Sequence, residues 1–370
     1  MLCAKPRTPI HGGALEGLAQ RYALHAADLI DFSANINPFG PPPAVLALLA
    51  DRDAVTRSLA AYPDRDASSL KSAISERYTV PRAAIAVGNG GGALFDSMLR
   101  SIAPTRCLVP IPAFSEYRRA IEACGHGWET FALESREDFR LDPRRTIAEI
   151  ERNSPGVLIL TNPHNPSGAL APRDALLDIV HAASAMHCTV LLDEAFIDYA
   201  PGESLLADAA TMEHLVVFRS VTKFYAMPAM RVAYAVAAPP LAERIEAFLP
   251  SWSTSTLAIE AAARAIGDRL FDEQNIRRNA MLRDEVARHL GDIGVRVLPS
   301  AANYVFLELP ESWGTRELIC EKLVRSWGMV VRDCGDYDGL ADRSFVRVAV
   351  KDRSSNERLI QAFRSLSHEK

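Results

Sequence analysis

The chain has 370 residues, of which 48% are hydrophobic and 24% charged, the composition of a folded globular protein. This length is well above the usual size of one domain and favours two lobes that share one cleft. The formal net charge of −5 provides no broad basic surface for nucleic acid, which leaves a small molecule or another protein as partner.

Six cysteines are scattered along the chain without any CxxC pair. Zinc sites and disulfide frameworks both need recognisable spacing, so the pattern predicts reduced thiols, no metal site and a cytoplasmic protein. Each cysteine is interpreted as a small buried hydrophobe. The N-terminus carries no apolar run of signal-peptide length, and no stretch approaches the ~20 apolar residues of a membrane span.

From about residue 67 the predicted elements alternate between helices and short apolar strands. A helix over 67–78 precedes a strand over 84–87, which runs into glycines and then into a helix that continues to Arg100. Further strands are expected at 107–109, 157–160, 189–192, 215–218 and 232–237. These runs are continuous rather than alternating, which is typical of a parallel sheet with helices on both faces.

After Pro250 the pattern becomes that of a smaller α+β lobe. It contains a long helical region over 257–289, helices at 316–327 and 356–366, and strands at 295–298, 304–309, 330–332 and 345–350. The first forty residues carry loop signals and are assigned to the same lobe. The predicted division is therefore a large domain over 41–250 and a discontinuous small domain of 1–40 and 251–370.

Four segments that follow predicted strands carry candidate chemistry, because ligands of open α/β sheets collect at the carboxyl ends of strands. In the first, 219–223, Lys223 follows a buried strand, where a lysine is costly unless it is paired or chemically used. Such surroundings lower the amine pKa, as Schiff-base formation requires. Ser220, Thr222 and Arg231 could bind a phosphate. Taken alone, the segment could equally be an exposed loop lysine.

The second and third segments offer a carboxylate and an amide. Asp193, at the end of a predicted strand, is the kind of group that keeps a pyridinium nitrogen protonated, although a helix N-cap or a metal ligand is the alternative. Asn165 lies in the run Asn-Pro-His-Asn-Pro-Ser-Gly at 162–168, where two prolines and a glycine lock the loop. Its amide could be aimed at a fixed acceptor, such as a phenolic oxygen, and a simple Asn-Pro turn is the alternative.

The fourth segment is Gly-Asn-Gly-Gly-Gly at 88–92, between a strand and a helix. Its glycines would let the backbone approach a phosphate at a helix N-terminus. A dinucleotide fingerprint needs glycine at the sixth position, which is Ala93, and the usual acidic partner is not evident. The phosphate of a single-ring cofactor fits better, and a dinucleotide-binding oxidoreductase is the alternative.

In this order and spacing the segments resemble fold-type I pyridoxal 5′-phosphate (PLP) enzymes of the aspartate aminotransferase class, over essentially the whole chain. The resemblance implies an α/β fold with a mostly parallel, helix-covered sheet in the large domain and a smaller α+β domain. It implies that Lys223 forms the Schiff base with PLP, that Asp193 pairs with the pyridinium nitrogen and that Asn165 binds the phenolic oxygen. The other cofactor contacts that it implies are Gly91, Gly92, Ser220, Thr222 and Arg231 on the phosphate, Phe114 on the ring and, from the second subunit of a homodimer with shared active sites, Tyr62.

Two positions depart from the pattern of that class. Position 196 is Phe, where many of these aminotransferases have a Tyr that bonds the same phenolic oxygen. The glycine-rich loop has Gly-Gly-Ala at 91–93, where relatives often place polar residues, so backbone groups must supply most of its phosphate contacts.

Two branches of the class fit, the histidinol-phosphate aminotransferases and the threonine-phosphate decarboxylases of cobalamin biosynthesis. The segments 11–13, 31–38, 193–199 and 222–226 are more similar to the second branch. That resemblance implies decarboxylation of O-phospho-L-threonine to (R)-1-amino-2-propanol O-phosphate, with transfer of an amino group to 2-oxoglutarate as the alternative. The substrate contacts that it implies are His11, Gly12, Asn35, Asn165, Arg332 and Arg347.

The two arginines also carry an argument of their own. Arg332 ends a predicted strand and Arg347 lies inside another, beside apolar neighbours. Inward-facing arginines are suited to bidentate capture of anions, and a phosphorylated amino acid presents two anionic groups. A surface charge is the alternative for either residue. We expect these substrate-side residues to decide between decarboxylation and transamination, because the cofactor motifs suit both reactions.

Overall fold

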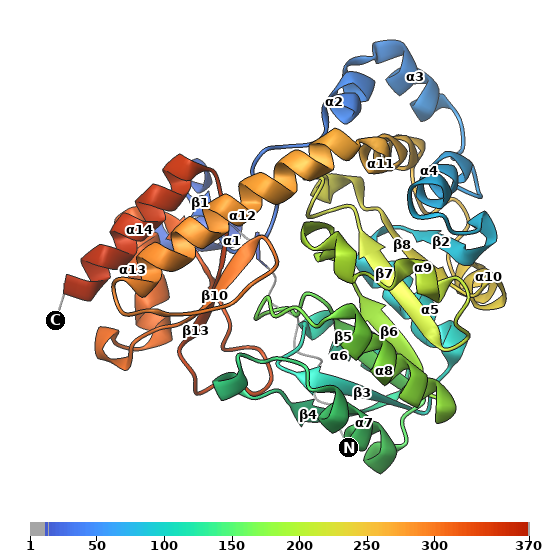
Figure 1. Cartoon of the computed structure of the whole chain (residues 1–370). Coiled ribbons are helices and arrows are strands. Elements are labelled where there is room, and N and C mark those ends of the chain that lie inside the picture. The colour runs from blue at the N-terminus through green and yellow to red at the C-terminus, as the bar shows by residue number, and fades with distance from the viewer. Residues whose placement is uncertain (1–11, 14, 369–370) are drawn as a thin grey trace, which may run out of the picture.

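A seven-stranded sheet organises the larger body of the computed structural model, which describes residues 12–13 and 15–368 (Figure 1). Every neighbouring pair is parallel except the two that β8 makes, so the mostly parallel sheet is confirmed. Because β8 is the single reversed strand, the carboxyl ends of the other six share one edge. In spatial order the strands are β2 (Ile85–Gly88), β8 (Ala233–Ala237), β7 (Leu215–Ser220), β6 (Thr189–Asp193), β5 (Val157–Thr161), β3 (Arg106–Ile111) and β4 (Gly127–Ala132).

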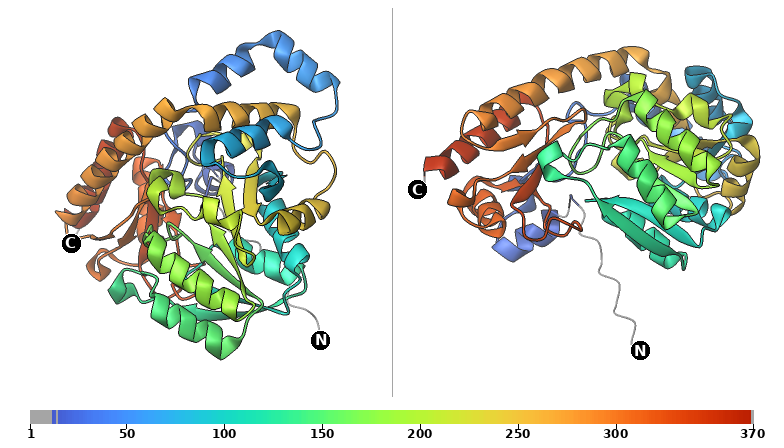
Figure 2. Two further views of the ribbon diagram at one scale, coloured as in Figure 1. Left: turned by 45° about the vertical axis from the view of Figure 1, so that its right-hand side comes forward. Right: turned by 60° about the horizontal axis from the view of Figure 1, so that its bottom comes forward.

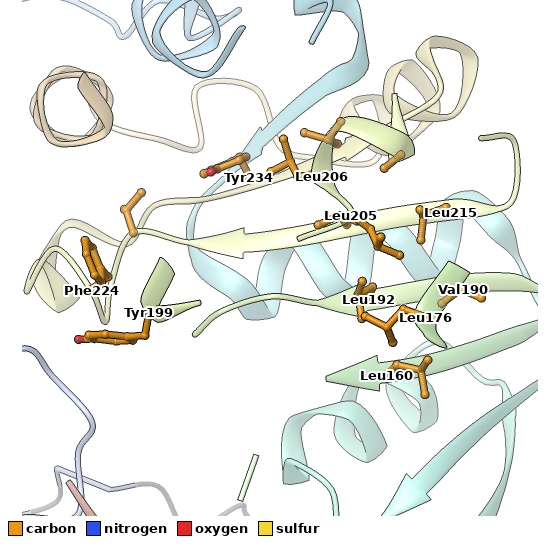
Figure 3. Close-up of a cluster of buried hydrophobic side chains, with 14 of the residues drawn as sticks. Leu160, Leu176, Val190, Leu192, Tyr199, Leu205, Leu206, Leu215, Phe224 and Tyr234 are labelled. Carbon is orange, nitrogen blue, oxygen red and sulfur yellow. The ribbon is translucent and has the colours of Figure 1, made fainter. Parts of the chain in front are cut away.

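Helices cover both faces of this sheet, which explains why its central strands are continuously apolar. Figure 3 shows one face, where Leu160, Leu192 and Leu215 of three neighbouring strands pack with Leu176 and other helical side chains. The helices on this face are α4 (Ser68–Tyr78), α7 (Pro143–Asn153), α8 (Arg173–Ala185), α9 (Leu206–Ala209) and α11 (Thr256–Gly267). The opposite face packs against α5 (Gly90–Ile102), α6 (Ser115–Ala123) and α10 (Pro239–Ala247).

The smaller body is built on a four-stranded antiparallel sheet in the order β12 (Arg332–Asp333), β13 (Phe345–Ala349), β10 (Tyr304–Glu308) and β9 (Arg296–Leu298). A short parallel pair, β1 (Ile30–Asp31) with β11 (Met329–Val330), ties the N-terminal segment to it. One face of the sheet packs under α12 (Arg269–Gly291), α13 (Arg316–Trp327) and α14 (Arg353–His368). The other face meets the larger body, where Phe306 and Phe345 pack against Phe139.

Helix α12 is shared by the two bodies. Phe271, near its start, belongs to the core of the larger body, whereas Val286 and Leu290, near its end, belong to the core of the smaller one. In Figures 1 and 2 it runs from α11 across to α14. At 1.5 Å per residue its 23 residues span about 35 Å.

The predicted strands are present with one exception, and the helix predicted over 316–327 is α13 itself. The strand predicted over 330–332 is wrong as a single element, because it divides into β11, which pairs with β1, and β12, which pairs with β13. The long helical region over 257–289 is wrong in one respect, because it breaks at Asp268. The carboxylate of Asp268 accepts a hydrogen bond from the backbone N–H of Phe271 (3.0 Å) and caps α12.

Other elements were not predicted. The edge strand β4 was missed because its residues alternate between exposed and partly covered, unlike the continuous apolar runs of the central strands. Within the first forty residues, where loop signals were noted, the helix α1 (Leu15–Tyr22) forms. The helices α2 (Pro43–Ala50) and α3 (Arg52–Ala60) follow in a stretch for which no element was predicted.

The division of the chain at residues 40 and 250 stays a prediction. The N-terminal strand β1 lies with the smaller body, while α11, just beyond residue 250, packs against α4 of the larger one. None of the helices in the described ranges is long and apolar enough to cross a lipid bilayer.

Candidate active site

Three neighbouring strands bring the candidate residues together at the carboxyl edge of the large sheet. Strand β5 ends at Thr161, directly opposite Asp193 at the end of β6, and the loop 162–168 begins there. Strand β7 ends at Ser220, and Lys223 follows within the next turn. Three of the four sequence segments therefore meet because parallel strands place their ends side by side.

The carboxylate of Asp193 is buried, and each of its oxygens already accepts one hydrogen bond. Its Oδ1 accepts from the backbone N–H of Ala195 (2.9 Å), and its Oδ2 accepts from the hydroxyl of Tyr117 (2.5 Å). Burial raises the pKa of Asp193 to about 6, and the Tyr117 hydrogen bond opposes that rise. Each oxygen keeps a lone pair, so the carboxylate can still accept a proton donor such as a protonated ring nitrogen.

Tyr117 has a role that the sequence did not reveal. Its hydroxyl lies 2.5 Å from Asp193 and 2.8 Å from the hydroxyl of Thr161. If Tyr117 donates to the carboxylate, Thr161 must donate to Tyr117, which makes a chain of two donors that ends on the charge. Tyr117 stands three residues after Phe114, so one turn of helix placing both at the same site was the available signal.

The pKa of the Lys223 amine is closer to neutral pH than that of an ordinary lysine. Burial is the main cause that lowers its pKa to about 8, and the positive charges of Arg347 and Arg231 lower it further, against the carboxylates of Asp193 and Asp31. A neutral amine is the form that reacts with a carbonyl group. Lys223 therefore has the electrostatic surroundings that Schiff-base formation needs, and an exposed loop lysine does not describe it.

Ion pairs on the other side of the strand ends hold β6 and β7 in register. Arg219 is almost completely buried and pairs with Glu194 (2.9 Å) and with Asp198 (2.8 Å). Glu194 follows Asp193 directly, and Arg219 precedes Ser220. The pairs therefore fix the strand ends from which the two candidate cofactor ligands project.

A phosphate cradle lies where α5 begins at Gly90. A side chain on Gly90 would place Cβ 2.6 Å from Nη2 of Arg231, and the positive φ of Gly90 (+75°) also favours glycine at this point. No side chain caps this end of α5, which leaves its first backbone N–H groups, including those of Gly91 and Gly92, for an anion. Arg231 lies on the surface of the cradle, and Thr222 donates its backbone N–H to Ser220 Oγ (3.2 Å). These groups fit the phosphate of PLP.

Asn165 is oriented by an arginine of the smaller body. Nη1 of Arg347 donates to Asn165 Oδ1 (2.5 Å). Because arginine can only donate, the amide oxygen must face it and the Asn165 NH2 group must face away. The donation of that group to a cofactor oxygen stays a prediction.

The loop 162–168 is fixed on both sides. His164 bridges Ser167 Oγ (2.7 Å) and the carbonyl of Pro112 (3.0 Å), and burial lowers the pKa of His164 to about 4, so it is a neutral structural group. On the side of the smaller body, the Tyr304 hydroxyl donates to the His164 carbonyl (2.8 Å). A side chain on Gly168 would place Cβ 2.2 Å from Ser300 Oγ. The loop thus joins the two bodies at the site.

The two substrate-side arginines lie directly opposite each other on β12 and β13. Both are buried. Besides Asn165, Arg347 reaches the carbonyl of Ser33 (3.3 Å), and its Nε has no hydrogen-bond partner within the described part of the chain. Arg332 instead pairs with Asp336. Two adjacent cations on one sheet face form a site for anions.

The N-terminal candidates lie beside Arg347 where they can be described. Gly12 packs against the carbonyl of Ser33, where an added Cβ would come within 2.3 Å of the oxygen. Asn35 is buried, and its Oδ1 has no partner among the described residues. His11 lies outside the described residues.

Two aromatic candidates differ in placement. Phe114 immediately precedes α6 and meets the Tyr117 ring edge-on at 5.7 Å, close to Asp193. Tyr62 is 81% exposed and packs against Trp252, with ring centroids 4.9 Å apart. The chain does not bring Tyr62 to its own cofactor residues in the way it does Phe114, and its role on a second subunit stays a prediction.

Phe196, at the position where many aminotransferases of the class have a tyrosine, lies in a small hydrophobic cluster. It is buried and packs edge-on against Tyr304, with centroids 5.1 Å apart. The five described cysteines are free, and no group of His, Cys, Asp or Glu within residues 12–13 and 15–368 is arranged to hold a metal ion.

Comparisons with known proteins agree with this geometry. The family model for aminotransferase class I and II matches residues 27–363. A threonine-phosphate decarboxylase of Salmonella typhimurium is 32% identical over 96% of this chain and 96% of its own length. A histidinol-phosphate aminotransferase of Methanocella arvoryzae is 28% identical over 95% and 94%. The solved L-threonine-O-3-phosphate decarboxylase from Porphyromonas gingivalis has a TM-score of 0.79 at 26% identity, covering 90% of this chain and 98% of that one.

Proposed function

The chain belongs to the aminotransferase class I and II family, and on that premise we propose that it is a PLP-dependent decarboxylase of O-phospho-L-threonine. Its products are CO2 and (R)-1-amino-2-propanol O-phosphate, and its place is in adenosylcobalamin biosynthesis. The observation that carries the proposal is the pair Arg332 and Arg347, side by side on β12 and β13. They offer one cation to each of the two anionic groups of a phosphorylated amino acid.

The residues at the sheet edge hold the cofactor. Lys223 supplies the amine, Asp193 the counter-charge for the ring nitrogen and Asn165 a donor for the ring oxygen, while Phe114 stacks on the ring. When bound, PLP supplies an electron sink next to the substrate Cα. The phosphate ligands are the backbone groups and side chains of Gly91, Gly92, Ser220, Thr222 and Arg231.

The smaller body orients the substrate. Arg347 binds one anionic group of the substrate through its unpaired Nε, while its Nη1 stays bonded to Asn165. This group then lies near Lys223, whose pKa the charge of Arg347 already lowers. Arg332 binds the other anionic group. Asn35, with its unpaired amide oxygen, and Gly12 complete this side together with His11. As the carbon–carbon bond to the carboxylate breaks, a proton must replace CO2 at Cα. Lys223 is the group placed to hold that proton, because its amine titrates near pH 8.

Tyr62 completes the site of a second subunit. It is a large aromatic side chain held on the surface against Trp252, and exposed aromatic side chains are typical of interface anchors. The active unit is then a homodimer with shared sites. The scattered cysteines, of which the five described ones are unpaired, support a cytoplasmic location.

The proposal is tested by giving the purified, PLP-loaded protein O-phospho-L-threonine alone. CO2 should be released without any oxoacid, and phosphorus NMR should show the amine phosphate. Absence of CO2 release would reject decarboxylation. Formation of glutamate from histidinol phosphate and 2-oxoglutarate in a parallel reaction would support the aminotransferase instead.

A further inference from the structure

Arg332 is already occupied by a carboxylate of its own chain. Its Nη2 donates to both oxygens of Asp336 (2.9 and 2.7 Å), and its Nη1 donates to the carbonyl of Asp333 (2.6 Å). The arginine side chain is 7% exposed and that of Asp336 is 25% exposed. The carboxylate is therefore the more exposed member of the pair, and it neutralises the guanidinium that an incoming anion would bind.

A second anion at Arg332 competes with the Asp336 carboxylate. A guanidinium binds an oxyanion with two parallel hydrogen bonds either from Nε and Nη2 or from Nη1 and Nη2. Nη2 takes part in both arrangements and already donates to the two oxygens of Asp336, while Nη1 donates to the carbonyl of Asp333. An anion that approaches the guanidinium therefore meets the negative charge of Asp336, and it binds most strongly once this carboxylate has moved away.

The loop can release the carboxylate without unfolding. Its backbone is fixed from behind by Arg316, which pairs with Asp333 (2.6 Å) and donates to the carbonyl of Arg343 (2.6 Å). Gly335 packs on the same guanidinium so closely that an added Cβ would clash with it. Asp336 has only its side-chain bonds to Arg332 to lose, and one rotation takes its partly exposed carboxylate into water.

We propose that Asp336 is an internal competitor for Arg332, a residue that the phosphate group of the substrate displaces and that sets a threshold of affinity for anions at this arginine. This inference rests on the proposed function, because it takes Arg332 as a substrate contact. The competition raises the dissociation constant of every anion at Arg332 by the same factor. Weak ligands such as simple carboxylates are thereby lost at working concentrations. A phosphate monoester, with up to two charges and three acceptor oxygens, remains bound.

The test uses PLP-loaded protein, so that the phosphate subsite of the cofactor is filled, and titrates it with inorganic phosphate in a calorimeter. Asp336→Asn should lower the dissociation constant of phosphate about fivefold, the scale of one partly exposed ion pair. The matched control is Asp338→Asn, which removes a carboxylate of the same loop that faces Arg118 at 3.7 Å and should leave phosphate binding unchanged.

A double-mutant cycle shows whether the effect passes through Arg332. In an Arg332→Gln background, Asp336→Asn should no longer tighten phosphate binding. In steady-state assays, Asp336→Asn should lower the KM for O-phospho-L-threonine with little change in kcat, whereas a merely structural role would lower both kcat and thermal stability. If Asp336→Asn does not fold, Asp336→Ser should give the same tightening.

Unchanged or weaker phosphate binding in a folded Asp336 variant would overturn the inference. So would tightening that persists without Arg332. Because the titration needs no turnover, a protein that released no CO2 from O-phospho-L-threonine would refute the proposed function and leave this result standing on its own.

Discussion

The two halves of the site are built in different ways. On the cofactor half, Asp193 and Thr161 are register partners on neighbouring strands, and Asp193 also bonds the backbone two residues along. On the substrate half, Arg347 is held by Asn165, 182 residues away, and by Ser33, 314 residues away. Neighbouring strand ends of one sheet preorganise the first half. In the second half β12 and β13 bring Arg332 and Arg347 together, but the bond from Arg347 to Asn165 forms only when the two bodies are packed together. The cofactor half therefore depends on one sheet, whereas the substrate half depends on a sheet and on the contact between the two bodies.

The sharpest way to separate the halves is Lys223→Ala. Loss of the amine should reduce kcat/KM on the order of 10⁴-fold, because no other group replaces it in cofactor attachment and proton transfer. Binding of inorganic phosphate to the substrate half should be unchanged by calorimetry. The control is Lys71→Ala on α4, which removes the ion-pair partner of Glu246 on α10 and should keep most activity. Comparable loss in both variants would argue against a special role for Lys223.

A smaller effect should follow Arg347→Lys. Lysine keeps the charge but cannot grip an anion and the Asn165 oxygen together, so kcat/KM should fall by roughly 10²-fold, mainly through KM. Steady-state kinetics measure the split. The control is Arg343→Lys, an exposed residue on the same body that pairs with Glu308 (2.7 Å). If Arg347→Lys matched the parent enzyme, the smaller body would not bind the substrate through this residue.

The cofactor half can be probed alone through pH. Lys223 reacts as a neutral amine, and its pKa is lowered to about 8. The rate of Schiff-base formation between the cofactor-free protein and PLP should therefore rise about tenfold per pH unit from pH 6 and level off above pH 8. Stopped-flow absorbance follows this reaction. A rate that kept rising to pH 10 would mean that the lysine has its ordinary pKa.

The smallest expected change is that of Tyr117→Phe. The ring keeps its contacts with Phe95 and Phe114, but Asp193 loses a donor that favours its charged form. Its pKa, about 6 in the parent, should rise by about one unit, so the acid limb of the kcat/KM profile and of PLP affinity should move to higher pH.

At neutral pH the loss of activity in Tyr117→Phe should be only a few-fold. The control is Tyr234→Phe, which removes a buried hydroxyl from the opposite face of the sheet. An acid limb at the same pH in both variants would show that the Tyr117 hydroxyl does not tune Asp193.

Sequence predicted the cofactor half well for a physical reason. Lys223, Asp193 and Asn165 each follow a continuous apolar strand, so a one-dimensional pattern already places them at one edge of a sheet. The helix break at Asp268 was missed because a single capping carboxylate interrupts an otherwise unbroken helical pattern.

The substrate half could be predicted only as a set of residue types. The sequence suggested that Arg332 and Arg347 face inward, but it did not identify their partners. Asn165 reaches Arg347 only because the two bodies pack together, Ser33 lies 314 residues from Arg347, and Asp336 follows Arg332 by four residues in a loop without a helical or strand pattern. The Tyr117 hydroxyl was missed for another reason, since a helix of one βαβ unit reaches the strand end of another within the larger body.

The continuous helix α12 couples the two bodies. Since the helix has no break between Phe271 and Leu290, a movement of the smaller body would move the whole helix with it. The capped turn at Asp268, where α12 begins, is the point about which such a movement would pivot. Over a length of about 35 Å, a tilt of about 5° at that turn would carry the far end about 3 Å. A change in the cap could therefore alter the grip of Arg332 and Arg347 on a substrate without touching either residue.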